Sequence, residues 1–513
     1  MTVAAFRRKT AGARNVAASY LGAAAEGAVF LLLTPFLVRR LGLAVYGIWG
    51  LAVSLADWIP LLDFGLREAL LKYVAAHQAK NDTAAARRTI EAVAFLYVGI
   101  GLLAALGVVA AAWWILPHFV STGADLKTLR TVFFILGASA VVGVPAGAMG
   151  SLLEGLQRFD ILNVLRAGHQ TLRFALVVVA VQLDAGVVGV AVADLVARFA
   201  LHVARFVVIR RMYPELVPLP KPHFGEMDRL FGLGMWNALR QAADVASLRV
   251  FEPILAAFGA LPEVGAFYAG RRFAAVPAEA IVPLAGVLLP LASEMEAEGR
   301  HEALKRTLLE TTKLALIVAV PFALIIGIGA PVIQSNWLSG RAPGTEIVMT
   351  IFSGVFVAVA AFLPSEAILI GLGNSRLVSL CTLSQLVLTV GLGVPFAASW
   401  GAPGLAVAAL IATLTTQVAV LIPAAASACG VSWRDGIARA FAPALVGGIP
   451  VGAAMYAVRD YIAVGGLAAL AVWSVVGLAL YAAICWRFAL SDAERAFIRH
   501  HVSRILTGED DEA

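Results

Sequence analysis

Hydrophobic positions along this chain collect into about fourteen long stretches, and polar residues are confined mainly to the segments between them. Each stretch is close to the roughly 20 residues with which an α-helix crosses a bilayer. The stretches are continuous rather than alternating, so they predict helices and not strands. The predicted spans are 15–38, 44–66, 90–116, 129–153, 160–182, 186–208, 230–257, 264–291, 308–333, 346–371, 376–397, 403–427, 437–457 and 462–485.

Composition supports a membrane protein. Of the 513 residues, 60% are hydrophobic and 14% are charged, and the mean hydropathy is +0.86. A soluble chain of this length cannot enclose so much apolar surface, whereas lipid accommodates it. We therefore predict an all-α polytopic membrane protein. Only Leu183–Ala185 separates the fifth and sixth spans, so twelve or thirteen spans is the alternative count.

Lysine and arginine are distributed unequally over the segments between the spans. The two tails and the even-numbered connections hold 26 of the 39 basic residues, and the odd-numbered connections hold six. Cytoplasmic connections carry the excess of Lys and Arg in membrane proteins. We therefore expect both termini to be cytoplasmic, which requires an even number of spans. Basic connections facing anionic lipid also explain a pI near 9.3, so we expect membrane lipids and not nucleic acid as partners.

The two halves of the chain resemble each other at a nearly fixed offset of 215 to 218 residues. The matching positions are Pro35 with Pro253, Gly47 with Gly265, Gly155 with Gly371, and Gly186 with Gly401. A repeat of this length holds six spans, and an even number gives both copies the same orientation. We expect two parallel six-helix bundles related by a pseudo-two-fold axis, with spans one and seven lining a cleft. This architecture is typical of alternating-access transporters.

The repeat and the polar segments divide the chain into five parts. The longest polar interruption within the chain, Arg210–Arg229, is proline-rich and typical of a linker. The predicted parts are an N-terminal six-helix bundle at 1–209, a cytoplasmic linker at 210–229, a C-terminal six-helix bundle at 230–429, two additional transmembrane helices at 430–486 and a cytoplasmic tail at 487–513.

Motifs of enzymes and metal sites do not occur in the sequence. It has no P-loop, no HExxH or GxSxG motif and no cluster of histidines. Cys381, Cys429 and Cys485 lie in or beside apolar spans without the spacing of metal ligands, so we interpret them as buried thiols. We therefore expect no catalysis, no metal and no cofactor.

Charged residues inside the predicted spans are the candidates for a functional site, because a charge in lipid is costly and normally faces a cavity or a partner. Spans seven and eight concentrate them, with Arg240, Asp244, Arg249, Glu252, Arg271, Arg272 and Glu279. A net positive, water-filled cavity accounts for this group better than buried pairs do. The planar fork of arginine suits diphosphate and carboxylate. The predicted substrate-binding residues are Arg240, Arg249, Arg271 and Arg272, together with Arg173 from the first half.

Other charges favour structural interpretations. Asp63 and Arg67, and likewise Asp194 and Arg198, are four residues apart near helix ends and are typical of ion pairs on one helix face. A further group lies at span ends, where long side chains reach the membrane surface, and we assign it no function. These residues are Arg39, Arg40, Arg205 and Lys313.

Carboxylates among these charges offer a route to ion coupling, and the candidates are Glu26, Asp57, Asp244 and Glu252. Asp244 is one turn from Arg240, and Glu252 is three residues from Arg249. Asp57 and Glu26 have no arginine within a turn of their own helices, so we expect them to be better placed for coupling to H⁺ or Na⁺. The alternative is that the acids only neutralise the arginines.

The same regions resemble the polysaccharide-biosynthesis transporters of the multidrug/oligosaccharidyl-lipid/polysaccharide (MOP) superfamily, the O-antigen-type flippases. The likeness covers nearly the whole chain, and the LLDFGL block with its preceding LG…YG is its most specific part. The resembling blocks are Thr34–Gly42, Tyr46–Gly47, Leu61–Leu66, Lys72–Ala76, Asp244, Val264–Arg272 and Pro290–Ser293.

The resemblance implies two six-helix bundles, commonly with two further helices. It also implies export of a lipid-linked oligosaccharide, typically on undecaprenyl diphosphate, from the cytoplasmic to the outer leaflet of the bacterial inner membrane. Cavity arginines would hold the anionic head group, and a polysaccharide polymerase is a candidate partner. The acids in the predicted cavity depart from a purely cationic lumen.

Two other functions compete with this interpretation. A cation-coupled multidrug exporter on the same fold predicts an acidic, arginine-poor cavity, and the four arginines of spans seven and eight argue against it. A membrane-embedded glycosyltransferase or polymerase needs catalytic groups on a sizeable extramembrane loop. The longest polar interruption within this chain is about 20 residues. A scaffold would leave the charges inside the spans unexplained.

Overall fold

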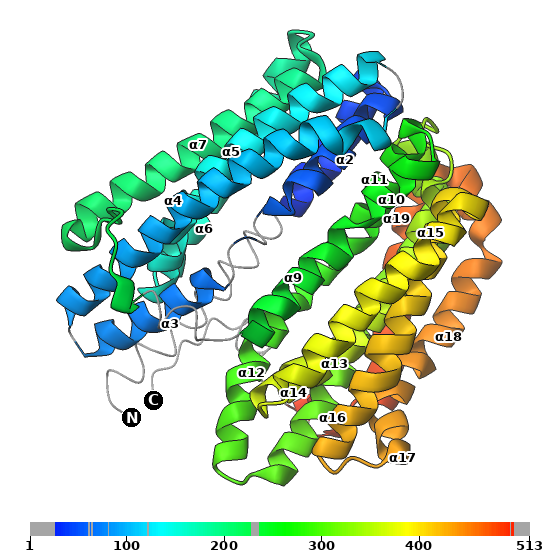
Figure 1. Cartoon of the computed structure of the whole chain (residues 1–513). Helices are drawn as coiled ribbons and strands as arrows, with labels where there is room; N and C mark the ends of the chain where they lie inside the picture. Colours follow the sequence, from blue (N-terminus) through cyan, green and yellow to red (C-terminus); the bar gives the residue numbers. More distant parts are fainter. Residues whose placement is uncertain are drawn as a thin grey trace.

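The computed structural model describes residues 26–59, 62, 65–80, 82–120, 123–226, 235–492 and 494–496. Within this part of the chain all regular structure is helical. Figure 1 shows two helical bundles that meet at one end and splay apart at the other. We call these the joined end and the splayed end. The splayed end carries α3 and α12.

The first bundle contains the helical residues 26–41 and helices α2 to α7. The bounds are α2 Leu43–Ala56, α3 Leu66–Ala79, α4 Thr83–Trp114, α5 Gly123–Gly155, α6 Phe159–Gln182 and α7 Gly186–Met212, with short 3₁₀ turns at Leu116–His118 and Pro214–Leu216. α5 is the central helix of this bundle, because it contacts α2, α3, α4, α6 and α7.

The second bundle contains α9 to α16, and α14 is its central helix. The bounds are α9 Met235–Arg249, α10 Phe251–Phe258, α11 Leu261–Ala275, η4 Val276–Ala280, α12 Val282–Ala297, α13 His301–Trp337, α14 Thr345–Gly371, α15 Ser375–Thr413, η5 Leu414–Leu421 and α16 Ile422–Ala428. The remaining elements are α17 Trp433–Gly436, η6 Ile437–Phe441, α18 Ala442–Ala457, α19 Arg459–Ile484 and η7 Cys485–Ala489. Of these, η6, α18 and α19 pack on α13.

These helices reproduce predicted spans three to six and nine to fourteen. Nine of the described helices are long and apolar enough to cross a membrane. Leu183–Ala185 is a turn between α6 and α7, so the fifth and sixth spans are separate. α15 bends at Gly401, which has φ 60°, and this divides spans eleven and twelve. Its repeat counterpart Gly186 also has φ 60°. The prediction of an all-α polytopic membrane protein is confirmed.

Large apolar side chains cover the outside of the bundles. Leu102, Leu106 and Trp114 of α4 are 65%, 69% and 74% exposed. Ile90 and Val93, on another face of the same helix, are fully buried. An apolar exterior of this kind is costly in water and favourable in hydrocarbon.

At the joined end, α2 and α11 cross with almost no space between their backbones. A Cβ atom on Gly47 would lie 2.0 Å from the carbonyl oxygen of Leu261 and 3.2 Å from the nitrogen of Gly265. Reciprocally, a Cβ atom on Gly265 would lie 2.5 Å from the carbonyl oxygen of Leu43 and 3.1 Å from the nitrogen of Gly47. Gly47 and Gly265 are 218 positions apart, and so are Leu43 and Leu261. The pseudo-two-fold axis of the repeat therefore passes between Gly47 and Gly265.

Spans two and eight are interrupted at equivalent positions. α2 ends at Ala56 and α3 begins at Leu66, whereas α11 ends at Ala275 and α12 begins at Val282. At the offset of 218, residues 57–65 correspond to 275–283, so the two breaks match. Past its break, α3 packs on α4 and α5, and α12 packs on α13 and α14. The bundles splay apart beyond these breaks (Figure 1).

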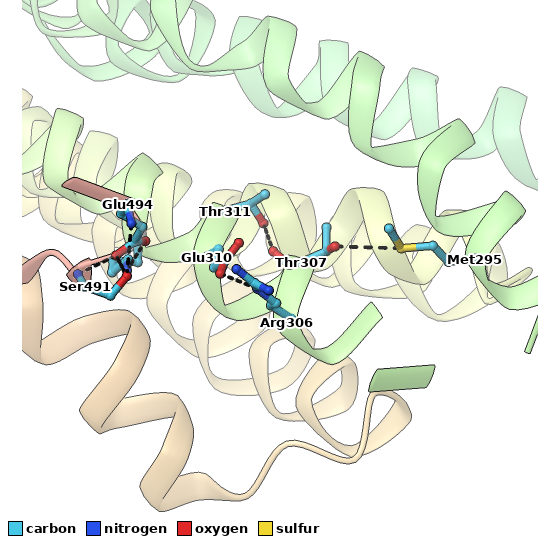
Figure 2. Close-up of polar contacts among 8 residues, drawn as sticks. Met295, Arg306, Thr307, Glu310, Thr311, Ser491 and Glu494 are labelled. Carbon is cyan, nitrogen blue, oxygen red and sulfur yellow. Dashed lines mark hydrogen bonds and ion pairs between the residues drawn. The ribbon is translucent and has the colours of Figure 1, made fainter. Parts of the chain in front are cut away.

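Residues after α19 return to the second bundle. The backbone nitrogen and hydroxyl of Ser491 each donate to Glu494 Oε2 at 2.8 Å, a contact drawn in Figure 2. Glu494 Oε1 accepts a hydrogen bond from Lys313 of α13. We expected Lys313 to extend to the membrane surface, but it is buried. The expectation was wrong because its partner comes from a distant part of the sequence.

Candidate functional site

A cavity of about 620 Å³ lies among α2, α5, α7 and α9, with contributions from α3, α4 and α6. Its lining includes four arginines and three acids, so its formal charge is positive with His202 neutral. Besides Tyr97, the ionisable lining residues are Asp57, Arg67, Glu154, Arg166, Arg198, His202, Arg205 and Asp244.

Small residues on α5 make room for the charged side chains of α7. Ser139, Gly143, Gly147 and Gly150 line the cavity at spacings of three or four, which places them on one face of the helix. A Cβ atom on Gly150 would lie 3.3 Å from Arg205 Nη1. One on Gly143 would lie 3.6 Å from His202 Nε2. The glycines therefore let these two side chains lie close to the α5 backbone.

Three polar atoms of cavity-lining residues are buried without a hydrogen-bond partner in the described structure. They are Ser139 Oγ, His202 Nδ1 and Arg205 Nε. Leaving a buried polar group unsatisfied costs about 1–3 kcal/mol. Such groups are therefore rare unless they serve a site. Together they offer a polar ligand partners that the fold itself does not satisfy.

Arg198 is fixed by a buried ion pair with Asp194 on its own helix. Asp194 is 1% exposed and accepts from Arg198 Nε at 2.6 Å and from Arg173 Nε at 2.7 Å. The predicted pairing of Asp194 with Arg198 is present. Arg173, predicted to bind substrate, instead joins α6 to this acid and does not line the cavity.

Arg271 and Glu252 form a buried ion pair within the second bundle. Arg271 donates through Nε and Nη2 to Glu252 Oε1 at 3.1 and 2.7 Å. The second carboxylate oxygen accepts from Ser54 of α2 at 2.8 Å. Glu252 is 0% exposed and Arg271 is 6% exposed. This pair stabilises the seam between the bundles and does not line the cavity.

Arg272 and Arg249 bring positive charge to the two acids that the sequence had placed far from arginine. Arg272 Nη2 lies 3.8 Å from Glu26 Oε1, and Arg249 Nη2 lies 2.9 Å from Asp57 Oδ2. Arg272 Nη1 also donates to the Tyr268 hydroxyl at 3.3 Å. Each acid was chosen because its own helix offers no arginine. In the structure the partners come from the other bundle.

Three of the four predicted arginines of spans seven and eight have described side chains, and none of these three lines this cavity. Arg249, Arg271 and Arg272 make the inter-bundle and buried contacts above, while the side chain of Arg240 lies outside the described residues. Asp57 and Asp244 do line the cavity. Asp63 and the side chain of Glu279 fall outside the described part of the chain. Spans one and seven were expected to line the cleft; α9 does so, and residues 26–41 do not line this cavity.

Sequence reasoning missed the arginines of the first bundle. Arg205 was assigned to the membrane surface because it lies at the end of an apolar span. The overlooked signal is the spacing of Asp194, Arg198, His202 and Arg205, which places a charged stripe along one face of α7. A run of small residues on α5 was the matching signal on the facing helix.

Comparisons with known proteins identify the family. A family model described as polysaccharide biosynthesis protein matches residues 13–296. A search of curated proteins gives no match. An inward-facing multidrug resistance MATE family transporter of the MOP superfamily superposes with a TM-score of 0.70 at 17% identity, covering 79% of this chain and 95% of that chain.

Two further solved structures are similar. Lipid II flippase MurJ in an inward closed conformation gives a TM-score of 0.63 at 12% identity, covering 89% of this chain and 98% of that chain. An outward-facing MATE family transporter gives 0.58 at 17% identity, covering 82% and 96%. Because the family model covers more than half of the sequence, this chain belongs to the polysaccharide biosynthesis protein family and has the MOP superfamily fold.

Proposed function

We propose that this protein moves a lipid-linked oligosaccharide, of the undecaprenyl-diphosphate type, from the cytoplasmic to the outer leaflet by alternating access. The family assignment supports a role in polysaccharide biosynthesis. The fold is shared with a protein described as a lipid II flippase. We place the protein in the bacterial inner membrane with both termini and the splayed end on the cytoplasmic side, in accord with the excess of Lys and Arg there.

The single observation that carries this proposal is the basic, unsatisfied wall of the cavity. Arg205 Nε and His202 Nδ1 are buried without partners among the described residues, and Arg198 lies on the same helix face. Arginine suits a diphosphate because its planar fork donates two parallel hydrogen bonds. We assign the diphosphate to this wall and the lipid tail to the hydrocarbon outside the bundles.

The cavity arrangement also supports a direction of entry. Its lining extends from Asp57, at the end of α2, to Arg67 and Arg166 toward the splayed end. A head group entering from the splayed end meets Arg67, Arg166 and Arg205, which lie near one another, before it reaches Arg198, about two turns further along α7. Separation of α2 from α11 at the joined end would then expose the bound head group to the opposite side. The protein supplies binding and movement in this scheme, and no bond is made or broken.

Binding of a diphosphate lipid by purified protein tests the assignment. The probe is geranylgeranyl diphosphate, with geranylgeraniol as the neutral comparison. Arg205→Ala should weaken binding of the diphosphate by roughly tenfold or more, because a hydrogen bond to a charged group is worth about 1.5–3 kcal/mol. Binding of the alcohol should not change.

Arg130 provides the matched control, because its guanidinium lies over the Trp113 ring, at 4.5 Å, away from the cavity. Equal losses in Arg205→Ala and Arg130→Ala would overturn the assignment. In cells, a deletion strain should accumulate lipid-linked oligosaccharide on the cytoplasmic leaflet. Loss of a glycan without such accumulation would contradict the proposed direction.

We also propose, as additions to this function, that transport is coupled to an ion and that a polysaccharide polymerase is a partner. Asp57 and Asp244 reach the cavity and are the acids placed to respond to H⁺ or Na⁺. A multidrug exporter for organic cations is less well supported, since the four arginines of the cavity lining would repel such substrates.

A further inference from the structure

The turns joining α3 to α4 and α12 to α13 are repeat equivalents at the splayed end. Thr83 begins α4, and His301, 218 positions later, begins α13. This is the same offset that relates Gly47 to Gly265 at the pseudo-two-fold axis. Figure 1 shows α3 and α12 at the same end of the molecule on different bundles.

The tips of these two hairpins carry opposite charge. Residues 72–88 contain four bases and one acid, a formal charge of +3. Their equivalents, 290–306, contain three bases and four acids, a formal charge of −1. Two equivalent positions have opposite signs, namely Lys80 against Glu298 and Asp82 against Arg300. All four of these side chains are exposed.

Contacts within the first hairpin leave its tip positive. Arg87 Nε is committed to Glu91 Oε1 at 3.0 Å, and Glu91 Oε2 lies 2.9 Å from His223 Nε2 of the linker. Lys72, Lys80 and Arg88 have no ion pair with any described residue. Asp82 caps α4 by accepting from the nitrogen of Ala85 at 2.9 Å.

Contacts within the second hairpin pair Arg300 and Arg306 with acids, and the excess of one acid over the bases leaves its tip negative. Arg306 pairs with Glu310 at 2.6 Å, and Thr307 Oγ1 lies 3.7 Å from Met295 Sδ, which joins α13 to α12 (Figure 2). Arg300 is shared between Glu298 at 2.5 Å and Glu294 at 3.6 Å. Exposed pairs of this kind contribute little stability and exchange partners readily.

We propose that the two hairpin tips are complementary surfaces that meet when the splayed end closes, with Lys80 facing Glu298 and Asp82 facing Arg300. A two-fold axis brings residues near it against their own equivalents, as it does for Gly47 and Gly265. Identical copies would bring like charges together there, as at Arg87/Lys305 and Arg88/Arg306, whereas Lys80/Glu298 and Asp82/Arg300 at the tips have opposite signs. Bending between α11 and α12, at 276–281, supplies the movement. The inference rests on the alternating-access part of the proposed function and not on its substrate.

Cysteine crosslinking of the full-length protein in lipid vesicles tests the contact. Thr83→Cys and His301→Cys place thiols at equivalent, exposed positions and leave the four charges intact. The native cysteines Cys381, Cys429 and Cys485 are buried and stay in place, with single variants as controls. We expect an intramolecular crosslink. It should increase with Gly47→Ala, because a Cβ atom there has no room against α11 and separates the joined end.

Charge exchange decides whether the tips attract each other. Glu298→Lys should lower the crosslinking rate by roughly two- to fivefold, as expected for an exposed ion pair. Adding Lys80→Glu should restore the rate. Glu296→Lys is the matched control, since it makes the same change on the same hairpin opposite Gln78, an uncharged equivalent. Crosslinking should also fall as salt is raised from 50 to about 500 mM.

Each outcome has a distinct meaning. A charge-dependent, salt-sensitive crosslink supports the contact, even if geranylgeranyl diphosphate does not bind, in which case only the proposed substrate fails. The crosslink could be absent both with Gly47 and with Gly47→Ala, in protein that binds geranylgeranyl diphosphate. That result overturns the contact and leaves the proposed function standing. A crosslink with equal rates in Glu298→Lys and Glu296→Lys, and no salt dependence, overturns the ionic attraction. If Gly47→Ala does not fold, the salt series and the charge-exchange variants are measured in protein that keeps Gly47. They decide in the same way whether the tips meet and attract each other.

Discussion

The guanidinium of Arg249, at the end of α9, lies 2.9 Å from the carboxylate of Asp57, just beyond α2. This salt bridge joins the two bundles where one partner also lines the cavity. Both side chains are partly exposed, at 26% and 32%. An anionic ligand in the cavity would lie near Asp57, since Asp57 and not Arg249 lines it, and would repel the carboxylate that forms this bridge. The empty and loaded transporter would then differ in how firmly the bundles are held together.

Neutralising the acids tests whether any of them couples transport to an ion gradient. We expect Asp57→Asn or Asp244→Asn to weaken such coupling more than Glu26→Gln does, because Asp57 and Asp244 line the cavity and Glu26 does not. The measurement is flipping of a diphosphate lipid in vesicles with and without proton or sodium gradients. Transport that is indifferent to both gradients would leave all of these acids with structural roles.

Removing Arg271 should destabilise the protein. Arg271→Ala leaves Glu252, which is 0% exposed, as a buried charge without its cation. Breaking a buried pair in this way costs about 3–5 kcal/mol. We expect a clear fall in the thermal midpoint in detergent. Arg272→Ala is the control. Its ion pair with the partly exposed Glu26 is longer, at 3.8 Å, so this substitution should lower the thermal midpoint less. Equal shifts would show that burial of the Arg271 pair is not the cause.

Much of the architecture follows from the sequence because it depends on spacing along the chain. The predicted span limits, the Leu183–Ala185 turn and the repeat all come from periodic or local signals. The crossing of Gly47 with Gly265 shows how far the repeat extends into three dimensions. The domain limits themselves stay predictions.

The site was harder to predict because its contacts join distant segments. Charges were compared only within a helix, so Asp57 and Glu26 looked isolated from arginine. Arg205 looked like a surface residue because it lies late in its span. It lies against Gly150, which is 55 positions earlier, so no local pattern could place it in a cavity.

The fit between Gly150 and Arg205 leads to a test of the cavity wall. A Cβ atom at Gly150 would lie 3.3 Å from Arg205 Nη1, so Gly150→Ala must displace the guanidinium slightly. We expect affinity for geranylgeranyl diphosphate to fall several-fold with little change in the thermal midpoint. Gly143→Ala is the matched control, because its Cβ atom would meet His202 at an ordinary 3.6 Å. Unchanged affinity in Gly150→Ala would argue against contact between Arg205 and the probe.

The tail contact at Glu494 should depend on pH. Burial acts to raise the pKa of Glu494, but hydrogen bonds from Lys313 and Ser491 outweigh it, so its pKa lies below the usual range. A carboxyl with a lowered pKa stabilises the folded form above its unfolded pKa and loses that contribution as pH falls through the folded value. We expect the tail to detach below about pH 4.

Limited proteolysis near Arg495 at graded pH measures that detachment. Glu494→Gln should be cleaved readily at neutral pH and show little further change on acidification. Asp492→Asn is the control, since Asp492 is fully exposed and makes no contact with α13 among the described residues. Acid-induced cleavage that persists unchanged in Glu494→Gln would assign the pH response elsewhere.

Arg271 and Glu252 both belong to the second bundle, and Ser54 is the first-bundle residue that donates to this pair in the described structure. When α2 leaves α11, the ion pair travels with one half of the protein and never dissociates. The separation gives up one hydrogen bond to a charged group, worth about 1.5–3 kcal/mol, rather than the larger cost of splitting a buried pair. Each 1.4 kcal/mol changes a rate by about tenfold. In the proposed alternating access, the Ser54 hydroxyl would therefore be the member of this network that the separation must break, while the Arg271–Glu252 pair stays intact.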